Sequence, residues 1–237
     1  MKLRKIIQII GYSMMILFLI CGGWLLILGG VNFFGPWKDL AILKIRKKYP
    51  SSSHQRGIIF YGASNFARWK EMEKDLAPYL VQNHGFGGSC DEDLMFYADR
   101  LLFPYDPRTV FFQTGSNDYV KIEGSDEEKI RKCMENKRQM FAEFHDRLPD
   151  AHFVIMSGLL LPGRAEYLAL TQKINANLKE MCQKTDYMTF IDAEDMTYST
   201  GSFRTELFVK DQIHLNREGQ LLWARDYILP ALEKTEE

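Results

Sequence analysis

Short apolar runs alternate with longer amphipathic stretches from Gly57 to the C-terminus. A continuous apolar run bounded by turn residues is typical of a buried strand, whereas apolar residues three or four positions apart are typical of a helix. The predicted strands are Gly57–Tyr61, a short strand that ends near Asn83, Thr109–Thr114, His152–Ser157 and Tyr187–Asp192. The predicted helices are Phe66–Tyr79, Asp91–Leu102, Asp126–Leu148, Ala165–Lys184 and Arg217–Leu232. This alternation predicts an α/β fold in which helices cover both faces of a parallel sheet.

A different pattern fills the N-terminus, where Ile6–Phe34 is apolar almost throughout and carries no charge. As a helix, its 29 residues would span roughly 43 Å, more than the ~30 Å hydrocarbon core of a membrane. The run is too long for the core of a signal peptide, and no small-residue cleavage site follows it. Ile20, just before Cys21, fits a lipoprotein cleavage site poorly. We therefore predict one uncleaved transmembrane helix that anchors the chain in a membrane.

The orientation of this predicted anchor depends on the basic residues at its two ends. Lys2, Arg4, Lys5 and the N-terminal amine precede the span, and five basic residues follow it from Lys38 to Lys48, so the two counts are close to a tie. Because the second group lies further from the span, we predict a cytoplasmic N-terminus and an extracytoplasmic main domain. The chain then divides into residues 1–35 (cytoplasmic tip and anchor), 36–56 (juxtamembrane connector) and 57–237 (globular domain).

Within the connector, apolar and basic residues alternate over Lys38–Lys48. Such a segment can lie on anionic lipid headgroups with its apolar side chains toward the membrane. A solvated helix is the other interpretation, and the pattern favours neither.

The net charge of −1 hides an uneven distribution. Eight of the 30 Lys and Arg residues, but only one of the 31 Asp and Glu residues, lie within the first 48 positions. The rest of the chain carries 22 basic and 30 acidic side chains, a formal charge of −8. An acidic body repels phosphate backbones, so we expect no nucleic-acid partner.

The four cysteines, Cys21, Cys90, Cys133 and Cys182, are widely spaced. None belongs to a Cys-x-x-Cys or Cys/His pattern, so the sequence supports neither a zinc site nor a disulfide framework. Buried free thiols are one interpretation, and a single Cys133–Cys182 bridge is the other.

Candidate chemistry begins in Gly57–Trp69, where a strand is followed by a turn at Gly62, a serine at Ser64 and an amphipathic segment. In this order, an α/β protein presents a nucleophile at the carboxyl edge of its sheet. An ordinary turn with a serine N-cap gives the same pattern.

Two further loops follow predicted strands and therefore lie at the same edge of the sheet. Asn83–Ser89 has three glycines within four residues, which lets a backbone N–H approach a ligand closely; it lacks the context of a dinucleotide fingerprint. Gln113–Asp118 offers Asn117, whose neutral carboxamide can donate a hydrogen bond to a developing oxyanion. Each stretch is also compatible with an ordinary loop or turn.

The last candidate stretch, Asp211–Asn216, precedes the final predicted helix. Asp211 lies three residues before His214, close enough to fix the tautomer of the imidazole and to stabilise the imidazolium. The other histidines have no such partner. His54, His145 and His152 are expected at the surface, whereas His84 lies in the glycine loop.

In this order, the four stretches resemble the SGNH/GDSL hydrolase superfamily over Gly57–Leu232. The matching segments are Gly62–Ser64, Asn83–Ser89, Gly115–Asp118 and the pair Asp211 and His214. The residues at 97–101, 104–108 and 206–209 are similar to the branch that includes the catalytic subunits of platelet-activating-factor acetylhydrolase. The resemblance implies a three-layer α/β/α sandwich with a parallel, flavodoxin-like sheet of about five strands, here preceded by one transmembrane helix.

The resemblance also implies a role for each matching residue. Ser64 would be the nucleophile, His214 the general base and acid, and Asp211 the residue that orients His214. The oxyanion hole would consist of the Ser64 and Gly88 backbone N–H groups and the Asn117 side chain. A serine hydroxyl is a weak nucleophile until a neighbouring base takes its proton, and each oxyanion donor contributes about 2.7–4 kcal/mol.

Two positions depart from the family pattern. Ala63 stands where the family's name-giving aspartate precedes the serine, and that aspartate is not a member of the triad. His84 stands where the related branch often has arginine. We expect His84, Phe66 and Trp69 to contact the substrate, with the loop Leu159–Arg164 as a further wall of the acyl pocket. Packing in the core is the other interpretation of the aromatic side chains.

The sequence therefore predicts a membrane-anchored serine esterase that hydrolyses short acyl esters, such as O-acetyl groups on envelope glycans or lipids, through an acyl-enzyme. An acyltransferase with the same acyl-enzyme, or a non-catalytic binding module on the same fold, is the alternative. The expected partners are the acyl-ester substrate and the membrane. This chemistry requires no metal and no organic cofactor, so we expect neither.

Overall fold

The computed structural model describes residues 36–236 and divides into two units, Met1–Leu43 and Lys44–Glu237. The predicted anchor over Ile6–Phe34 lies outside the described residues. Among the helices that are described, none is long and apolar enough to cross a membrane. The connector is helical over α2 (Pro36–Lys48).

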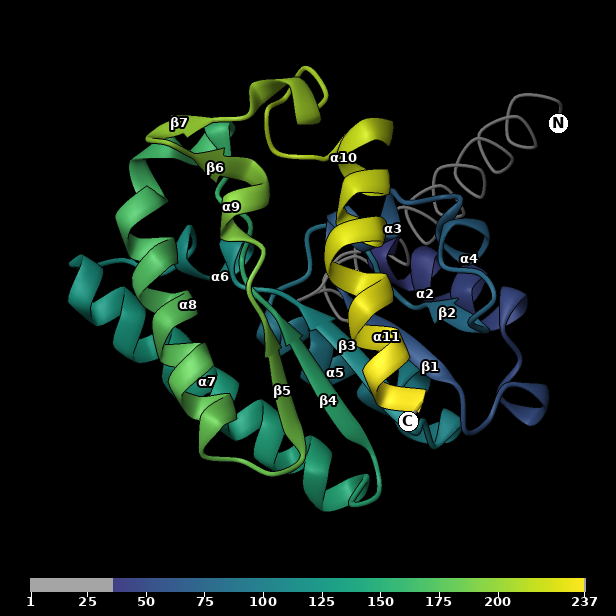
Figure 1. The fold of residues 1–237 in the computed structure, drawn as a ribbon. Coiled ribbons are helices and arrows are strands. Elements are labelled where there is room, and N and C mark those ends of the chain that lie inside the picture. Colours follow the sequence, from purple (N-terminus) through teal and green to yellow (C-terminus); the bar gives the residue numbers. More distant parts are fainter. Residues whose placement is uncertain (1–35, 237) are drawn as a thin grey trace, which may run out of the picture. The chain divides into compact units, whose positions relative to one another are not determined.

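Five parallel strands form one sheet in the order β2-β1-β3-β4-β5 (Figure 1). They are β1 (Ile58–Gly62), β2 (Val81–Asn83), β3 (Thr109–Gln113), β4 (His152–Met156) and β5 (Met188–Ile191). The predicted α/β class and the five-stranded parallel sheet are confirmed. A two-stranded antiparallel pair, β6 (Tyr198–Ser199) and β7 (Ser202–Phe203), was not predicted because each strand has only two residues.

Helices cover both faces of this sheet. Those on one face are α3 (Ser64–Ala67), α4 (Met72–Asp75), α10 (Arg217–Trp223) and α11 (Leu229–Glu236). Those on the other are α5 (Asp91–Leu101), α7 (Asp126–Arg147) and α8 (Leu168–Gln183) (Figure 1). Short turns complete the chain: α6 (Ser116–Tyr119), α9 (Glu194–Thr197), the 3-10 turns η1 (Ser51–Ser53), η2 (Phe103–Tyr105), η3 (Pro162–Tyr167) and η4 (Thr205–Leu207), and the π-helical turn η5 (Ala224–Ile228).

Successive side chains of the strands point to opposite faces, and both faces are buried. Phe60, Phe111 and Val154 lie side by side across β1, β3 and β4, and the rings of Phe60 and Phe111 stack at 4.5 Å. On the other face, Phe112 packs against Phe144 of α7 with 5.9 Å between ring centroids. Every strand in the middle of the sheet therefore contributes to two cores.

The predicted helix Phe66–Tyr79 is wrong, because the chain forms the two separate turns α3 and α4 there. The Asn83 side chain donates a 2.7 Å hydrogen bond to the Phe66 carbonyl, which a continued helix would have used to accept the N–H of Lys70. Pro78 disfavours helical backbone at the residue before it and limits the segment at its other end. The predicted helix Arg217–Leu232 is likewise interrupted, by the π-helical turn η5 ahead of Pro230, which has no N–H to donate.

Three cysteines within the described residues, Cys90, Cys133 and Cys182, are buried free thiols. The alternative of a Cys133–Cys182 bridge is therefore excluded. Burial raises the pKa of Cys133 and of Cys182 to about 12, so both remain protonated at neutral pH. Cys21 lies outside the described residues.

The two-sided core generates a direct test of the fold. Phe111 is fully buried, and Phe111→Ala removes its stacked ring, so we expect a loss of about 3–5 kcal/mol in the free energy of unfolding. Urea unfolding measures this loss. The matched control Leu80→Ala changes a side chain that is 88% exposed, and it should change stability by no more than about 0.5 kcal/mol. Equal effects of the two substitutions would contradict the assignment of Phe111 to the core.

Candidate active site

Ser64 is the first residue of α3, directly after β1 ends at Gly62. A Cβ at Gly62 would lie 2.5 Å from the Gln113 carbonyl oxygen of the neighbouring strand, so the sharp turn after β1 requires glycine. Because the N–H groups at the start of a helix have no partner within it, the Ser64 N–H is a free donor with respect to α3. The turn thus presents a hydroxyl and an N–H together at the carboxyl edge of the sheet.

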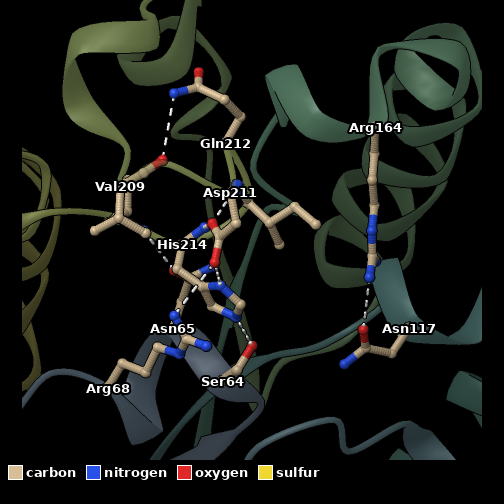
Figure 2. Close-up of polar contacts among 11 residues, drawn as sticks. Ser64, Asn65, Arg68, Asn117, Arg164, Val209, Asp211, Gln212 and His214 are labelled. Carbon is tan, nitrogen blue, oxygen red and sulfur yellow. Dashed lines mark hydrogen bonds and ion pairs between the residues drawn. The ribbon is translucent and has the colours of Figure 1, made fainter.

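The structure brings Ser64, His214 and Asp211 into one chain of hydrogen bonds (Figure 2). The Ser64 Oγ lies 2.8 Å from His214 Nε2, although the two residues are 150 positions apart. On the other side of the imidazole, Nδ1 lies 2.7 Å from Asp211 Oδ2. These are the distances that proton transfer from a serine hydroxyl to a histidine base requires.

Asp211 is held in its ionised form. Partial burial by itself raises the pKa of this carboxyl group, but hydrogen bonds from the His214 side chain and from the N–H groups of His214 and Ile213 lower it well below its ordinary value. A carboxylate only accepts hydrogen bonds, so the His214 Nδ1 must carry the proton. The Nε2 lone pair is then free to accept the Ser64 hydroxyl.

The loop after β2 (Asn83–Ser89) and the loop after β3 (Gln113–Asp118) meet beside Ser64, His214 and Asp211. The Asn117 Nδ2 donates a 3.0 Å hydrogen bond to the Ser89 carbonyl, which joins the loop after β3 to the loop after β2. Gly88, next to Ser89, has a left-handed backbone (φ 65°) that favours glycine. Figure 2 shows the Asn117 carboxamide with its oxygen turned toward Arg164.

Residues 57–222 match the sequence model of the GDSL-like Lipase/Acylhydrolase family. The chain belongs to this family. It is an SGNH serine hydrolase. No curated protein is significantly similar to this acylhydrolase in sequence.

Solved structures share the fold of this acylhydrolase at low sequence identity. One is a Streptococcus pneumonia protein provisionally described as a platelet activating factor (TM-score 0.66, 18% identity, covering 79% of this chain and 90% of that one). Another is an acetyl-xylooligosaccharide esterase of Geobacillus Stearmophilus, in a mutant form (TM-score 0.56, 13% identity, 76% and 94%). A third is the catalytic domain of the Streptococcus pneumoniae peptidoglycan O-acetyltransferase A (TM-score 0.54, 19% identity, 78% and 96%).

Two residues of the acylhydrolase that sequence analysis did not single out brace the histidine loop. The Asn65 Oδ1 accepts a 3.0 Å hydrogen bond from the Leu215 N–H. Directly after α3, the Arg68 Nη1 lies 3.3 Å from Asp211 Oδ2. The segment that carries Ser64 therefore also contacts the loop that carries Asp211 and His214. Asn65 and Arg68 are polar residues in an ordinary helix start, and nothing in their local sequence identifies partners some 150 positions away.

A buried ionic network supports the loops on the other side of the site. The Lys137 Nζ, on α7, lies 3.0 Å from both carboxylate oxygens of Asp91 and also donates to the Thr114 hydroxyl. Asp118 accepts a 2.8 Å hydrogen bond from the Asp91 N–H. Burial alone would lower the pKa of Lys137, but the neighbouring Asp91 and Asp118 carboxylates raise it above its ordinary value, so Lys137 stays charged. The network ties both loops to α7.

Asp118 is the unbalanced member of this network. It is 5% exposed, and its Oδ2 has no hydrogen-bond partner. Burial and the neighbouring Asp91 carboxylate raise the pKa of Asp118 to about 7. The Lys137 and Lys121 ammonium groups oppose this shift without cancelling it, so the Asp118 carboxyl group is partly protonated at neutral pH.

The three expected substrate contacts, His84, Phe66 and Trp69, are corrected by the structure. His84 is fully buried, its Nδ1 lies 2.6 Å from the Leu101 carbonyl oxygen, and burial lowers its pKa to about 4. Phe66 and Trp69 are buried and stack on Trp223 at 5.5 and 5.9 Å. The rings of Phe66 and Trp69 point into the core because the segment after Ser64 turns its apolar side toward α10. His84 is buried elsewhere, where its ring lies 4.5 Å from that of Tyr105. Within residues 36–236, no group of three His, Cys, Asp or Glu side chains is arranged to hold a metal ion.

The raised pKa of Asp118 makes the stability of the protein depend on pH. The pKa of Asp118 is about 7 in the folded protein and about 3.9 in an unfolded chain. The contribution of Asp118 to the free energy of unfolding is therefore complete below about pH 4 and is lost as the pH rises toward 7. Asp118→Asn cannot titrate. We subtract the free energy of unfolding of the wild type from that of Asp118→Asn, and we expect this difference to increase by about 1–2 kcal/mol between pH 5 and pH 7.

Urea unfolding at several pH values measures this difference. Asp150→Asn, which changes an exposed carboxylate, is the matched control. If the difference in the free energy of unfolding between Asp118→Asn and wild type stays constant or falls as the pH rises, the raised pKa of Asp118 is contradicted.

Proposed function

We propose that this acylhydrolase is a membrane-anchored serine esterase that hydrolyses short acyl esters, acetyl esters above all, through a Ser64–His214–Asp211 triad. The observation that carries the proposal is the continuous chain of contacts from Ser64 Oγ to His214 Nε2 at 2.8 Å and from Nδ1 to Asp211 at 2.7 Å. A scaffold that had lost its activity would not need these three groups in register.

In the first half of the reaction, His214 Nε2 removes the proton from Ser64 Oγ while Oγ bonds to the acyl carbon. The bond between that carbon and the leaving oxygen then breaks, and His214 gives its proton to the departing alcohol. The acyl group remains as an ester of Ser64. Throughout, Asp211 stays ionised and stabilises the imidazolium.

In the second half, water takes the place of the alcohol. His214 accepts a proton from the attacking water, the new tetrahedral centre collapses, and the bond to Ser64 Oγ breaks. The proton returns to Ser64 and the free acid leaves. Each half passes through an oxyanion, which the Ser64 N–H, the Gly88 N–H and the Asn117 Nδ2 stabilise by about 2.7–4 kcal/mol per donor.

Two similar structures support an acetyl ester as the substrate. One is named for its action on acetylated xylooligosaccharides, and the other is named as a peptidoglycan O-acetyltransferase. Both names place the acetyl group on a glycan, which an enzyme anchored at the cell envelope could reach.

Acyl transfer is the second candidate function, favoured by the similarity to the O-acetyltransferase domain. The acyl-enzyme is the same, and only the acceptor in the second half differs: a sugar hydroxyl replaces water. Product analysis separates the two functions, because an esterase releases one acetate per ester cleaved even when an acceptor glycan is present.

The membrane part of the proposal rests on sequence. Ile6–Phe34 is an uncharged apolar run long enough to span a bilayer, and basic residues flank it on both sides. The following unit would lie outside the cytoplasm, tethered through α2.

The central prediction concerns the nucleophile and its base. Full-length wild-type protein in mild detergent should hydrolyse p-nitrophenyl acetate and react with a fluorophosphonate probe. Ser64→Ala should abolish labelling and reduce kcat by about 10³-fold or more, and His214→Ala should reduce kcat similarly, because the attacking alkoxide can no longer form.

Ser202→Ala, at an exposed position of β7, is the control and should behave like wild type. A wild-type protein that neither hydrolyses the ester nor labels would overturn the catalytic proposal. Labelling of Ser64→Ala at the wild-type rate would show that the nucleophile is a different residue.

The orientation is tested by protease treatment of intact cells that produce the full-length chain. We expect the domain to be degraded, because it lies outside the cytoplasm, while a cytoplasmic marker protein survives. Protection of the domain until the cells are lysed would reverse the proposed orientation.

A further inference from the structure

Arg164 is a partly buried arginine in η3, the turn that follows β4 at the carboxyl edge of the sheet. The backbone departs from helical geometry there (φ −140°, ψ 38°). Its guanidinium reaches the loop after β3, where one nitrogen donates to the Ser116 carbonyl and the other lies 3.1 Å from the Asn117 Oδ1 (Figure 2). Arginine thus holds the one side-chain donor of the proposed oxyanion hole.

The chemistry of the two groups permits only one arrangement of the carboxamide. A guanidinium has donors and no acceptor, so only the oxygen of Asn117 can face Arg164. One hydrogen of the Asn117 NH2 group is donated to the Ser89 carbonyl at 3.0 Å, and the second hydrogen remains for a ligand. In the flipped arrangement, the Asn117 oxygen would face the Ser89 carbonyl and the developing oxyanion, both of which repel it.

The same short segment also contacts the other half of the site. The N–H of Gly163 donates a 2.8 Å hydrogen bond to the Gln212 carbonyl, in the loop between Asp211 and His214. A Cβ at Gly163 would lie 2.7 Å from the Asp211 carbonyl oxygen, so the two loops pack in direct contact. Gly163 and Arg164 therefore join the base side of the site to the oxyanion side.

We propose that Arg164 is a positioning residue that fixes the Asn117 carboxamide with its NH2 group toward the oxyanion, and that η3 sets the oxyanion side relative to His214. The inference rests on the proposed function of Ser64 and Asn117. Arg164 contacts no reacting atom, and its effect on the rate passes through Asn117.

The test compares Arg164→Ala, Asn117→Ala and the double variant in the full-length protein. Arg164→Ala should lower kcat for p-nitrophenyl acetate by about 10–100-fold with little change in KM, because an oxyanion donor acts in the transition state. Asn117→Ala should lower kcat by about 10²–10³-fold. The double variant should be no slower than Asn117→Ala, since residues that act as a unit are not additive.

Two further measurements separate positioning from folding. Millimolar guanidinium should restore part of the activity of Arg164→Ala and none of that of Asn117→Ala, and Arg164→Lys should recover only part of the rate because an ammonium lacks the planar fork. The control Arg131→Ala removes an exposed arginine of α7 and should leave kcat unchanged. If Arg164→Ala proves poorly folded, Arg164→Lys in the wild-type and Asn117→Ala backgrounds carries the same comparison.

The inference would be overturned if the losses in kcat of the two single variants multiplied in the double variant, or if Arg164→Ala changed only KM. In either case Arg164 would act independently of Asn117. An Arg164→Ala protein with wild-type kcat would overturn it as well. In both cases wild-type hydrolysis and Ser64 labelling leave the proposed function intact. Absence of both activities in the wild type would instead refute the proposed function, and this inference with it.

Discussion

The 2.8 Å contact between Ser64 Oγ and His214 Nε2 is the constraint on which the rest of the site depends. It joins the first strand–helix turn of the domain to the loop before its last helices, so every intervening crossover must bring the two ends to one sheet edge. The contact is useful only if both partners are rigid. Gly62 lets the first turn pass closely over β3, and Asn65 holds the histidine loop from the same short helix. The short helix α3 thus both carries Ser64 and contacts the loop that carries His214.

The other side of the site is held by charges rather than by apolar packing. Lys137 is fully inside the protein and binds both oxygens of Asp91, at the start of the helix that follows the Gly88 loop. A buried ion pair adds little net stability compared with an apolar pair, but it is geometrically demanding and costly to break. Its position under the Asn117 loop is consistent with a role in specifying loop geometry. Burial and the neighbouring Asp91 carboxylate raise the pKa of Asp118 to about 7, so this second carboxyl group is partly protonated at neutral pH.

The two sides meet at η3. Gly163 contacts the Asp211–His214 loop and Arg164 contacts the Asn117 loop, so adjacent residues of one turn face two groups that must be in register when a carbonyl is attacked. Loops are in general more mobile than the elements that they connect. The Gly163 N–H and the Arg164 guanidinium each tie η3 to one of these two loops by a hydrogen bond.

The sequence determined the α/β class, five strands and the loops that carry Ser64, Asn117 and His214, because strand periodicity and turn residues are local signals. Asp211 and His214 could be paired from sequence since they lie within one turn. The tertiary structure decided what depends on distant partners. The Asn83 side chain donates a hydrogen bond to the Phe66 carbonyl, which ends the predicted helix there. The rings of Phe66 and Trp69 stack on Trp223 in the core instead of contacting substrate as expected. The contacts of Lys137 with Asp91 and of Arg164 with Asn117 cross 46 and 47 positions. A single sequence carries no local signal for such contacts, because the packing of whole crossovers creates them.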